Sequence, residues 1–298
     1  MKKVIRRSAI ALASLALLAG GAFAVLVWLG DRKAGRQLEL RVVPISYTRD
    51  RAALRQGKYL FETRGCAECH GTDGRGIAFV DSPEVRLKSP NITTGPGGVV
   101  SDYNEGDWVR AVRHGVAPTG RPLRAMPSED YNRMSDADLA ALVAYVRTLP
   151  PVQGEPAEIR FPIIVKALYG AGLVKDAAEK IDHRRPPSPA MVPAVSAEYG
   201  AYVAAMCMGC HRAGFEGGPI AGGPPDWPPA ADLRPGGIIT IYDAPEKFVA
   251  MMRTGKRPGG SEVSRVMPFM SLRNLNDTDL LAIYAYLKTL APRRTGET

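Results

Sequence analysis

The chain has 298 residues, of which 45% are hydrophobic and 23% charged, so wholesale disorder is excluded and about two domains are expected. Four cysteines are too few for a disulfide scaffold of this length. The formal net charge of +9 includes four cations in the first seven residues. The remaining basic residues form no clustered stripe interleaved with aromatic side chains, so no nucleic-acid partner is expected.

An uncharged run covers residues 8–30 and follows the four N-terminal cations. As a helix it is about 34 Å long, enough to cross a bilayer core. Cations ahead of the run keep the N-terminus in the cytoplasm and place the rest of the chain in the periplasm. Ala22-Phe23-Ala24 fits a signal-peptide cleavage site, which would leave a soluble periplasmic protein. The run continues to Trp28, however, and this favours an uncleaved, single-pass anchor in the inner membrane.

The motif C-x-x-C-H occurs at residues 66–70 and again at 207–211, and it is the attachment signature for c-type haem. Two thiols three residues apart can add to the two vinyl groups of one porphyrin, and the next residue places an imidazole nitrogen under the iron. The motifs predict four thioether-forming residues and two iron ligands: Cys66, Cys69, Cys207 and Cys210, with His70 and His211. A zinc site or redox disulfides would leave both histidines without a role.

The two motifs belong to a longer repeat. Cys66 and Cys207 are 141 residues apart, and residues 134–149 match residues 275–290 at the same shift. A period as long as a domain indicates tandem duplication, with two covalently attached haem c groups in the chain. We expect the following segments: an anchor or signal segment at 1–30, a linker at 31–50, a first haem domain at 51–150, a proline-rich linker at 151–195 and a second haem domain at 196–298.

The repeat also selects a second axial ligand for each iron, because electron-transfer haems commonly have histidine and methionine ligands. Met126 and Met267 are 141 residues apart, and each precedes a proline. Met134 aligns with a leucine and Met270 with a glutamate, neither of which repeats the ligand. We therefore expect Met126 and Met267 to bind iron.

Each copy is predicted to be mainly α-helical, with helices packed around a porphyrin that supplies apolar volume to a small core. The predicted helices cover residues 51–63, 105–114 and 136–149 in the first copy, and 197–206, 245–254 and 277–290 in the second. A capping box of Ser135 and Asp138 is expected to start the last helix, and Asn276 and its partners repeat that arrangement. Residues 161–180 are expected to form a short amphipathic helix that packs across both domains or touches the membrane surface.

Five further residues have competing interpretations. His114 is expected at the surface or packed at a haem edge, and His183 is expected to be solvated, since it lies in a basic, proline-bounded linker. Trp108 is either a donor to a haem propionate or a core aromatic residue. Arg113 and Arg253 repeat, and they are either propionate partners or solvated arginines of a helix face.

These residues resemble class I c-type cytochromes, and more closely the multihaem cytochrome subunits of membrane-bound bacterial dehydrogenases of the alcohol and gluconate type. The matching segments are GKYLFETRGCAECHGTDGRG, SPNITTG, DWVRAVRHGVAPTGRPLRAMP, MSDADLAALVAYVRTLPPV and FPIIVKALYG, and in the second half GCHRAGFEGGPIAGG. The resemblance implies a contact of Gly57, Phe61 and Tyr145 between the first and last helices. In the second copy Ala204 replaces the aromatic residue.

The resemblance implies an electron carrier rather than an enzyme, so no catalytic residue is expected. The partners would be a membrane-bound or periplasmic dehydrogenase and a downstream acceptor, either a terminal oxidase or a soluble cytochrome of the respiratory chain. The alternative is a diheme enzyme, a peroxidase or a sulfur-compound dehydrogenase, with one exchangeable haem ligand. A methionine in register in both copies disfavours this alternative.

Overall fold

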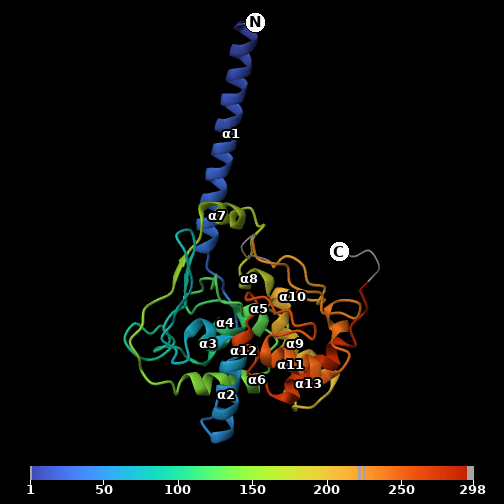
Figure 1. The fold of residues 1–298 in the computed structure, drawn as a ribbon. Helices are drawn as coiled ribbons and strands as arrows, with labels where there is room; N and C mark the ends of the chain where they lie inside the picture. The colour runs from blue at the N-terminus through green and yellow to red at the C-terminus, as the bar shows by residue number, and fades with distance from the viewer. Residues whose placement is uncertain (1, 221–222, 224–225, 294–298) are drawn as a thin grey trace.

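The computed structural model describes residues 2–220, 223 and 226–293. Residue 1 and residues 294–298, the ends of the predicted anchor segment and second domain, lie outside the described residues. A long N-terminal helix stands away from a head in which two helical units lie side by side (Figure 1). This agrees with the predicted mainly α-helical class.

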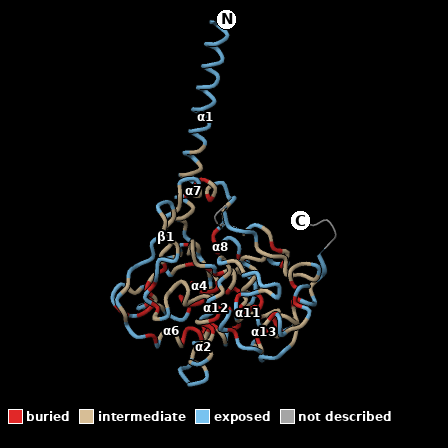
Figure 2. Tube along the Cα trace, in the orientation of Figure 1, coloured by how far each residue is buried: buried red, intermediate tan, exposed pale blue. Residues whose placement is uncertain are grey.

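The first helix, α1, covers Lys2–Ala34 and is exposed along almost its whole length, with Gly30 as its buried residue (Figure 2). Among the described residues it is the helix long and apolar enough to cross a membrane. Its apolar run ends at Gly30, and charged residues follow from Asp31. By length and composition an exposed apolar helix of this kind fits either a membrane anchor or a signal sequence.

The first haem domain contains five helices and two short strands, and a third strand from the following linker joins its sheet. Its helices are α2 (Arg51–Thr63), α3 (Cys66–His70), α4 (Glu105–His114), α5 (Ser128–Tyr131) and α6 (Asp136–Val146). The strands β1 (Ala78–Asp81), β2 (Arg86–Lys88) and β3 (Glu158–Arg160) form an antiparallel sheet in the order β1-β2-β3. The sheet was not predicted, because strands of three or four residues carry too little alternation to be recognised.

The second haem domain repeats the helices without a described sheet. It contains α9 (Ala197–Ala204), the 3₁₀ turn η1 (Ala205–Cys207), α10 (Met208–His211), η2 (Ile238–Ile241), α11 (Pro245–Thr254), α12 (Phe269–Leu272) and α13 (Asp277–Leu287). All six predicted helices of the two copies are confirmed. Helices α6 and α13 each end three residues before the predicted boundary, where shorter i to i+3 hydrogen bonds tighten the last turn.

Each domain is organised by a close crossing of its first and last helices. A Cβ atom on Gly57 would overlap the carbonyl oxygen of Ala141, and one on Gly200 would overlap the carbonyl oxygen of Ala282. The glycines therefore let the two backbones touch. These crossings join α2 to α6 and α9 to α13, and they place the core of each domain beside them.

The expected aromatic contact at the first crossing is confirmed, with 5.6 Å between the ring centroids of Phe61 and Tyr145. In the second domain the aromatic partner comes from a loop. Phe215 is fully buried and its ring lies edge-on to Tyr286 at 5.7 Å. Phe215 thus occupies the role that Ala204 cannot fill.

The two domains are joined by tyrosines that enter each other's helix caps. Tyr59 of α2 donates its hydroxyl hydrogen to Asp279 Oδ2 at 2.7 Å and accepts the backbone N–H of Asn276 at 3.0 Å. Asn276 and Asp279 begin α13 in the other domain. Asp279 is fully buried, so its carboxylate depends on such donors.

The reciprocal contact begins α6. Tyr202 of α9 donates to Asp138 and accepts the N–H of Ser135 at 3.1 Å. The predicted capping box is therefore only half correct: Ser135 Oγ accepts the N–H of Asp138, but the Asp138 carboxylate binds the tyrosine instead of the Ser135 N–H. In each domain a tyrosine hydroxyl from the other domain lies between the backbone N–H of the N-cap residue and the aspartate three positions later.

The linker forms two short helices instead of the single expected one. They are α7 (Ile163–Gly170) and α8 (Ala177–Lys180). Helix α7 packs on the lower end of α1, between that helix and the head (Figure 1). The expectation that this segment packs across both haem domains is therefore wrong for α7.

The tyrosine contact generates a stability prediction. Tyr59→Phe removes a hydrogen bond to a buried carboxylate and leaves the Asn276 N–H without its acceptor. We expect it to lower the free energy of unfolding by about 1.5–3 kcal/mol, the usual contribution of a hydrogen bond to a charged group. Denaturant unfolding of the holoprotein measures the change. Tyr145→Phe is the matched control, since no hydrogen bond of the Tyr145 hydroxyl is described, and equal effects of the two changes would contradict the assignment.

Candidate haem sites

Each C-x-x-C-H histidine lies at the end of a short helix and has one ring nitrogen held by a backbone carbonyl. His70 Nδ1 lies 3.1 Å from the Pro90 oxygen, and His211 Nδ1 lies 2.7 Å from the Ala231 oxygen. Because a carbonyl oxygen only accepts, Nδ1 must carry the proton in both rings. This leaves Nε2 of each ring as the unprotonated nitrogen that can bind iron.

Burial keeps these groups neutral. It lowers the pKa of His70 and of His211, which favours the uncharged form of both rings. Burial also raises the pKa of Cys66 and of Cys207 to about 12, and that of Cys69 to about 11. All four cysteines are free, so each motif presents an unpaired pair of thiols next to a neutral imidazole. This donor set fits a c-type haem.

The carbonyl that orients His70 belongs to the SPNITTG segment. Asn91 is fully buried, and its side chain donates to the Val152 oxygen at 2.9 Å and accepts the Thr93 N–H at 2.9 Å. These bonds fix the loop that carries Pro90. Sequence reasoning missed Pro90 and Ala231 as orienting residues, although each follows its histidine by 20 positions.

The methionines fall into two groups. Met126 and Met267 are partly buried and pack against the cores of their own domains. Met134 is a core residue that is only 7% exposed, whereas Met270 is 64% exposed. These environments suit the predicted roles, and iron ligation by Met126 and Met267 stays a prediction.

Trp108 provides a further test of whether the first domain fits a haem. The side chain is buried, and its indole Nε1 has no hydrogen-bond partner in the described part of the chain. Its ring meets Tyr103 edge-on at 5.3 Å. A buried donor without an acceptor is costly, and a haem propionate would satisfy it. The residue is therefore both a core aromatic and a suitable donor.

The repeated arginines have structural contacts within the protein, and Arg113 is not the solvated arginine of one expectation. Arg113 is buried and donates to the Met134 oxygen at 2.7 and 3.1 Å and to Asp136 at 2.6 Å. Arg253 binds the Leu275 oxygen and Asp277 in the corresponding way. Both guanidinium groups tie the middle helix of their domain to the start of its last helix.

The expectation that His183 is solvated is wrong. Its Nδ1 lies 3.0 Å from Nδ1 of His114, and its Nε2 donates to the Ala178 oxygen at 2.9 Å. Burial, with the nearby His183 and Arg113, lowers the pKa of His114 to about 4. This histidine pair connects the linker to the end of α4.

The two attachment loops also contact the opposite domains. Glu68, inside the first motif, accepts the N–H of Ser271 in α12. Gly209, at the same place in the second motif, donates its N–H to Asp130 of α5. Burial raises the pKa of Asp130 to about 7. These contacts bring the two candidate haem sites together at one interface.

One cation is buried at this interface. The Arg64 guanidinium lies 3.4 Å from Asp279 Oδ2 and 3.2 Å from Met206 Sδ, and its charge favours the thiolate forms of both Cys66 and Cys207. It therefore lies near both attachment sites. The aligned position in the second copy is an alanine, so comparison of the two copies does not single out Arg64.

Comparison with known proteins gives one family. The family model for cytochrome c matches twice, at residues 54–150 and 197–291. One of the subunits of nicotinate dehydrogenase from Pseudomonas putida is 30% identical over 263 residues, covering 80% of this chain and 21% of that protein. The cytochrome c subunit of alcohol dehydrogenase (quinone) from Gluconacetobacter polyoxogenes is 28% identical over 270 residues, covering 82% of this chain and 57% of that subunit.

A third relative, the cytochrome subunit of fructose dehydrogenase from Gluconobacter japonicus, is 32% identical over 136 residues, covering 43% of this chain and 28% of that subunit. The chain thus spans between about a fifth and somewhat over half of the length of these relatives. The double match, the paired thiols and the oriented imidazoles agree with one another. The chain belongs to the cytochrome c family and contains two of its domains in tandem, each with a covalently bound haem c.

Proposed function

We propose that the chain is a membrane-anchored diheme cytochrome c that carries electrons in a periplasmic respiratory chain. The donor would be a dehydrogenase, and the acceptor a terminal oxidase or a soluble cytochrome. Three relatives are named as cytochrome subunits of dehydrogenases for fructose, gluconate and alcohol, and a fourth as an oxidase subunit. The observation that carries the proposal is that each attachment loop contacts the opposite domain, at Ser271 and at Asp130, so both sites lie at one interface, as a two-centre electron carrier needs.

The proposed site residues are those of the repeat. Four cysteines would hold the porphyrins, and two histidines and two methionines would bind iron: Cys66, Cys69, Cys207, Cys210, His70, His211, Met126 and Met267. Haem iron, when bound, supplies reversible one-electron chemistry. The domain boundaries proposed above, 51–150 and 196–298, enclose one such set each.

The residues of the chain have three tasks in this function. The Pro90 and Ala231 carbonyls keep each imidazole in one tautomer and one orientation. The buried apolar surroundings favour the less charged, reduced state of a haem. The interdomain tyrosines hold the two sites at a fixed separation, so the geometry for electron passage need not be assembled anew at each transfer.

Helix α1 supports the proposed location. It is exposed, apolar and long enough to span a bilayer, and the cations at its N-terminus favour retention of that end in the cytoplasm. The haem domains would then lie on the periplasmic face of the inner membrane. Cleavage after Ala24 would instead release a soluble periplasmic protein.

Ligand variants test the site assignment. We expect Met126→Ala and Met267→Ala each to leave both haems attached and to lower one midpoint potential by on the order of 0.1 V, within the range that axial ligands span. Potentiometric titration followed by visible spectroscopy measures both potentials. The exposed Met270→Ala is the control and should change neither. A lowered potential in the control, with none in Met126→Ala or Met267→Ala, would refute the ligand choice.

Co-purification from native membranes, followed by addition of substrate, tests the function. The tagged full-length chain, solubilised from its native membranes, should co-purify with a dehydrogenase. Addition of that enzyme's substrate should then reduce both haems in the complex. Peroxide or sulfur-compound turnover by the chain alone, without substrate-dependent reduction in the complex, would contradict an electron-carrier role and favour the diheme enzyme.

A further inference from the structure

Helix α7 meets α1 in a backbone-to-backbone crossing. A Cβ atom on Gly30 of α1 would overlap the Lys166 carbonyl oxygen, and one on Gly170 of α7 would overlap the Leu26 carbonyl oxygen. Only glycines permit so close an approach. The crossing therefore fixes α7 at residues 26–30 of α1, the last turn of the uncharged run.

Polar contacts just beyond this turn hold the crossing in place. Lys166 of α7 pairs with Asp31 at 3.0 Å, and Lys33 pairs with Glu179 of α8 at 2.9 Å. Lys33 also donates to the Tyr169 oxygen at 3.0 Å. The charges at the end of α1 are thus joined to the linker.

A second group completes the connection. Arg36 donates to the Tyr169 hydroxyl at 2.7 Å and pairs with Asp176 at 2.7 Å. The Asp176 side chain is only 1% exposed, so this ion pair is shielded from water. The end of α1 and the linker are consequently connected by several ion pairs and hydrogen bonds, one of them shielded from water, and not by a free tether.

The apolar side chains of α7 are left without protein partners on one side. Ile163 is 60% exposed and Ile164 is 52% exposed, and Leu173, just after the helix, is 76% exposed. Trp28, in the turn of α1 that α7 crosses, is 57% exposed. Three strongly exposed aliphatic side chains within residues 163–173 thus lie on or just after a helix that is fixed to the end of a membrane-length helix.

We propose that residues 163–173 form a second membrane contact, lying in the interfacial layer of the bilayer that α1 crosses. The argument is geometric: α7 is fixed to the last turn of the apolar run, so the surface of a bilayer around that run lies beside the helix that carries Ile163 and Ile164. Lys166 can extend its charge toward the headgroups while its methylene stem stays in the apolar layer. Two contacts instead of one would set the tilt of the haem domains against the membrane. This inference rests on the proposed membrane anchor.

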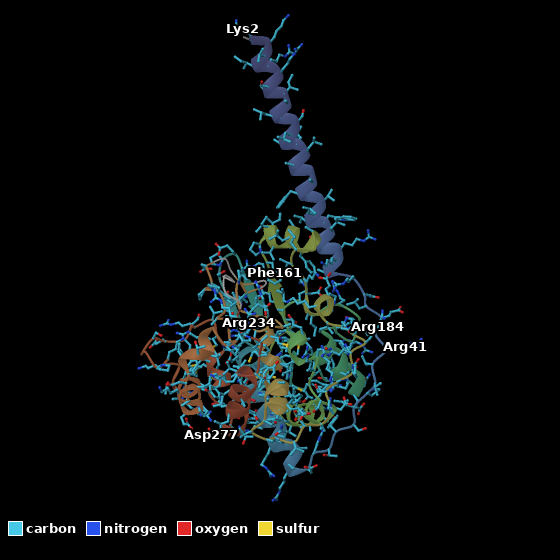
Figure 3. All side chains as sticks on the ribbon, turned by 90° about the vertical axis from the view of Figure 1, so that its right-hand side faces the viewer. Lys2, Arg41, Phe161, Arg184, Arg234 and Asp277 are labelled. Atoms are coloured by element: carbon cyan, nitrogen blue, oxygen red, sulfur yellow. The ribbon has the colours of Figure 1, made fainter. Side chains whose placement is uncertain are left out.

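Site-directed spin labelling tests it on the full-length holoprotein. Because all four native cysteines are proposed to be bound to haem, an introduced cysteine is the single reactive thiol. Ile164→Cys and, as a second position, Leu173→Cys would carry a nitroxide in vesicles of phosphatidylcholine and phosphatidylglycerol. The control is Asp277→Cys, at the end of the head opposite α1 (Figure 3), where the native side chain is exposed. Power-saturation EPR compares collision of each label with oxygen and with a water-soluble nickel chelate.

We expect labels at 164 and 173 to collide preferentially with oxygen, and the label at 277 with the nickel chelate. Flotation of the vesicles tests the anchor separately. Protein that floats while labels at 164 and 173 behave like the label at 277 would overturn the inference and leave the anchor standing. Protein that does not float would overturn both. Labels shielded from oxygen and nickel alike would show a protein partner on this surface and also overturn it.

Discussion

The arrangement of the head depends on a tyrosine hydroxyl inserted into a helix cap of the other domain. Tyr59 bridges the Asn276 N–H and the Asp279 carboxylate, and Tyr202 does the same at α6. Two needs are met by each hydroxyl: an N–H at a helix start gains an acceptor, and a carboxylate, which is fully buried at Asp279 and partly buried at Asp138, gains a donor. Because these caps begin the helices that form the core of each domain, the interface and the two domain folds stabilise one another.

This reciprocal interface explains why each attachment loop contacts the opposite domain. The capped helices follow directly after α5 and α12, which contact the attachment loops of the opposite domains through Asp130 and Ser271. The interface is also asymmetric, since Arg64 in the first domain has no counterpart in the second. A buried cation close to both sites gives the two otherwise similar haems unequal surroundings. The ion pairs and hydrogen bonds between α1 and the linker then hold the N-terminal helix in a defined position next to the linker.

The sequence predicted the parts of the structure that are encoded locally or by the repeat, namely the six main helices and the two attachment motifs, and the family resemblance added the contact of Phe61 with Tyr145. It did not predict the interface between the two domains, because the tyrosines that form it do not follow the repeat. Tyr59 and Tyr202 are 143 residues apart, so they fall out of the 141-residue register that relates the motifs and the methionines. The His183 contact and the role of Arg113 depend on tertiary packing. The carbonyls of Pro90 and Ala231 act through the backbone, which side-chain patterns do not report.

The central claim is that each half of the molecule binds one porphyrin through its own pair of cysteines and its own histidine. A denaturing intact mass of the matured protein, combined with a pyridine hemochrome spectrum, tests it most directly. The claim requires a mass increase of two haems per chain and a spectrum of the c type that accounts for all the haem. One covalent haem per chain, none, or haem that separates on acid–acetone extraction would contradict it.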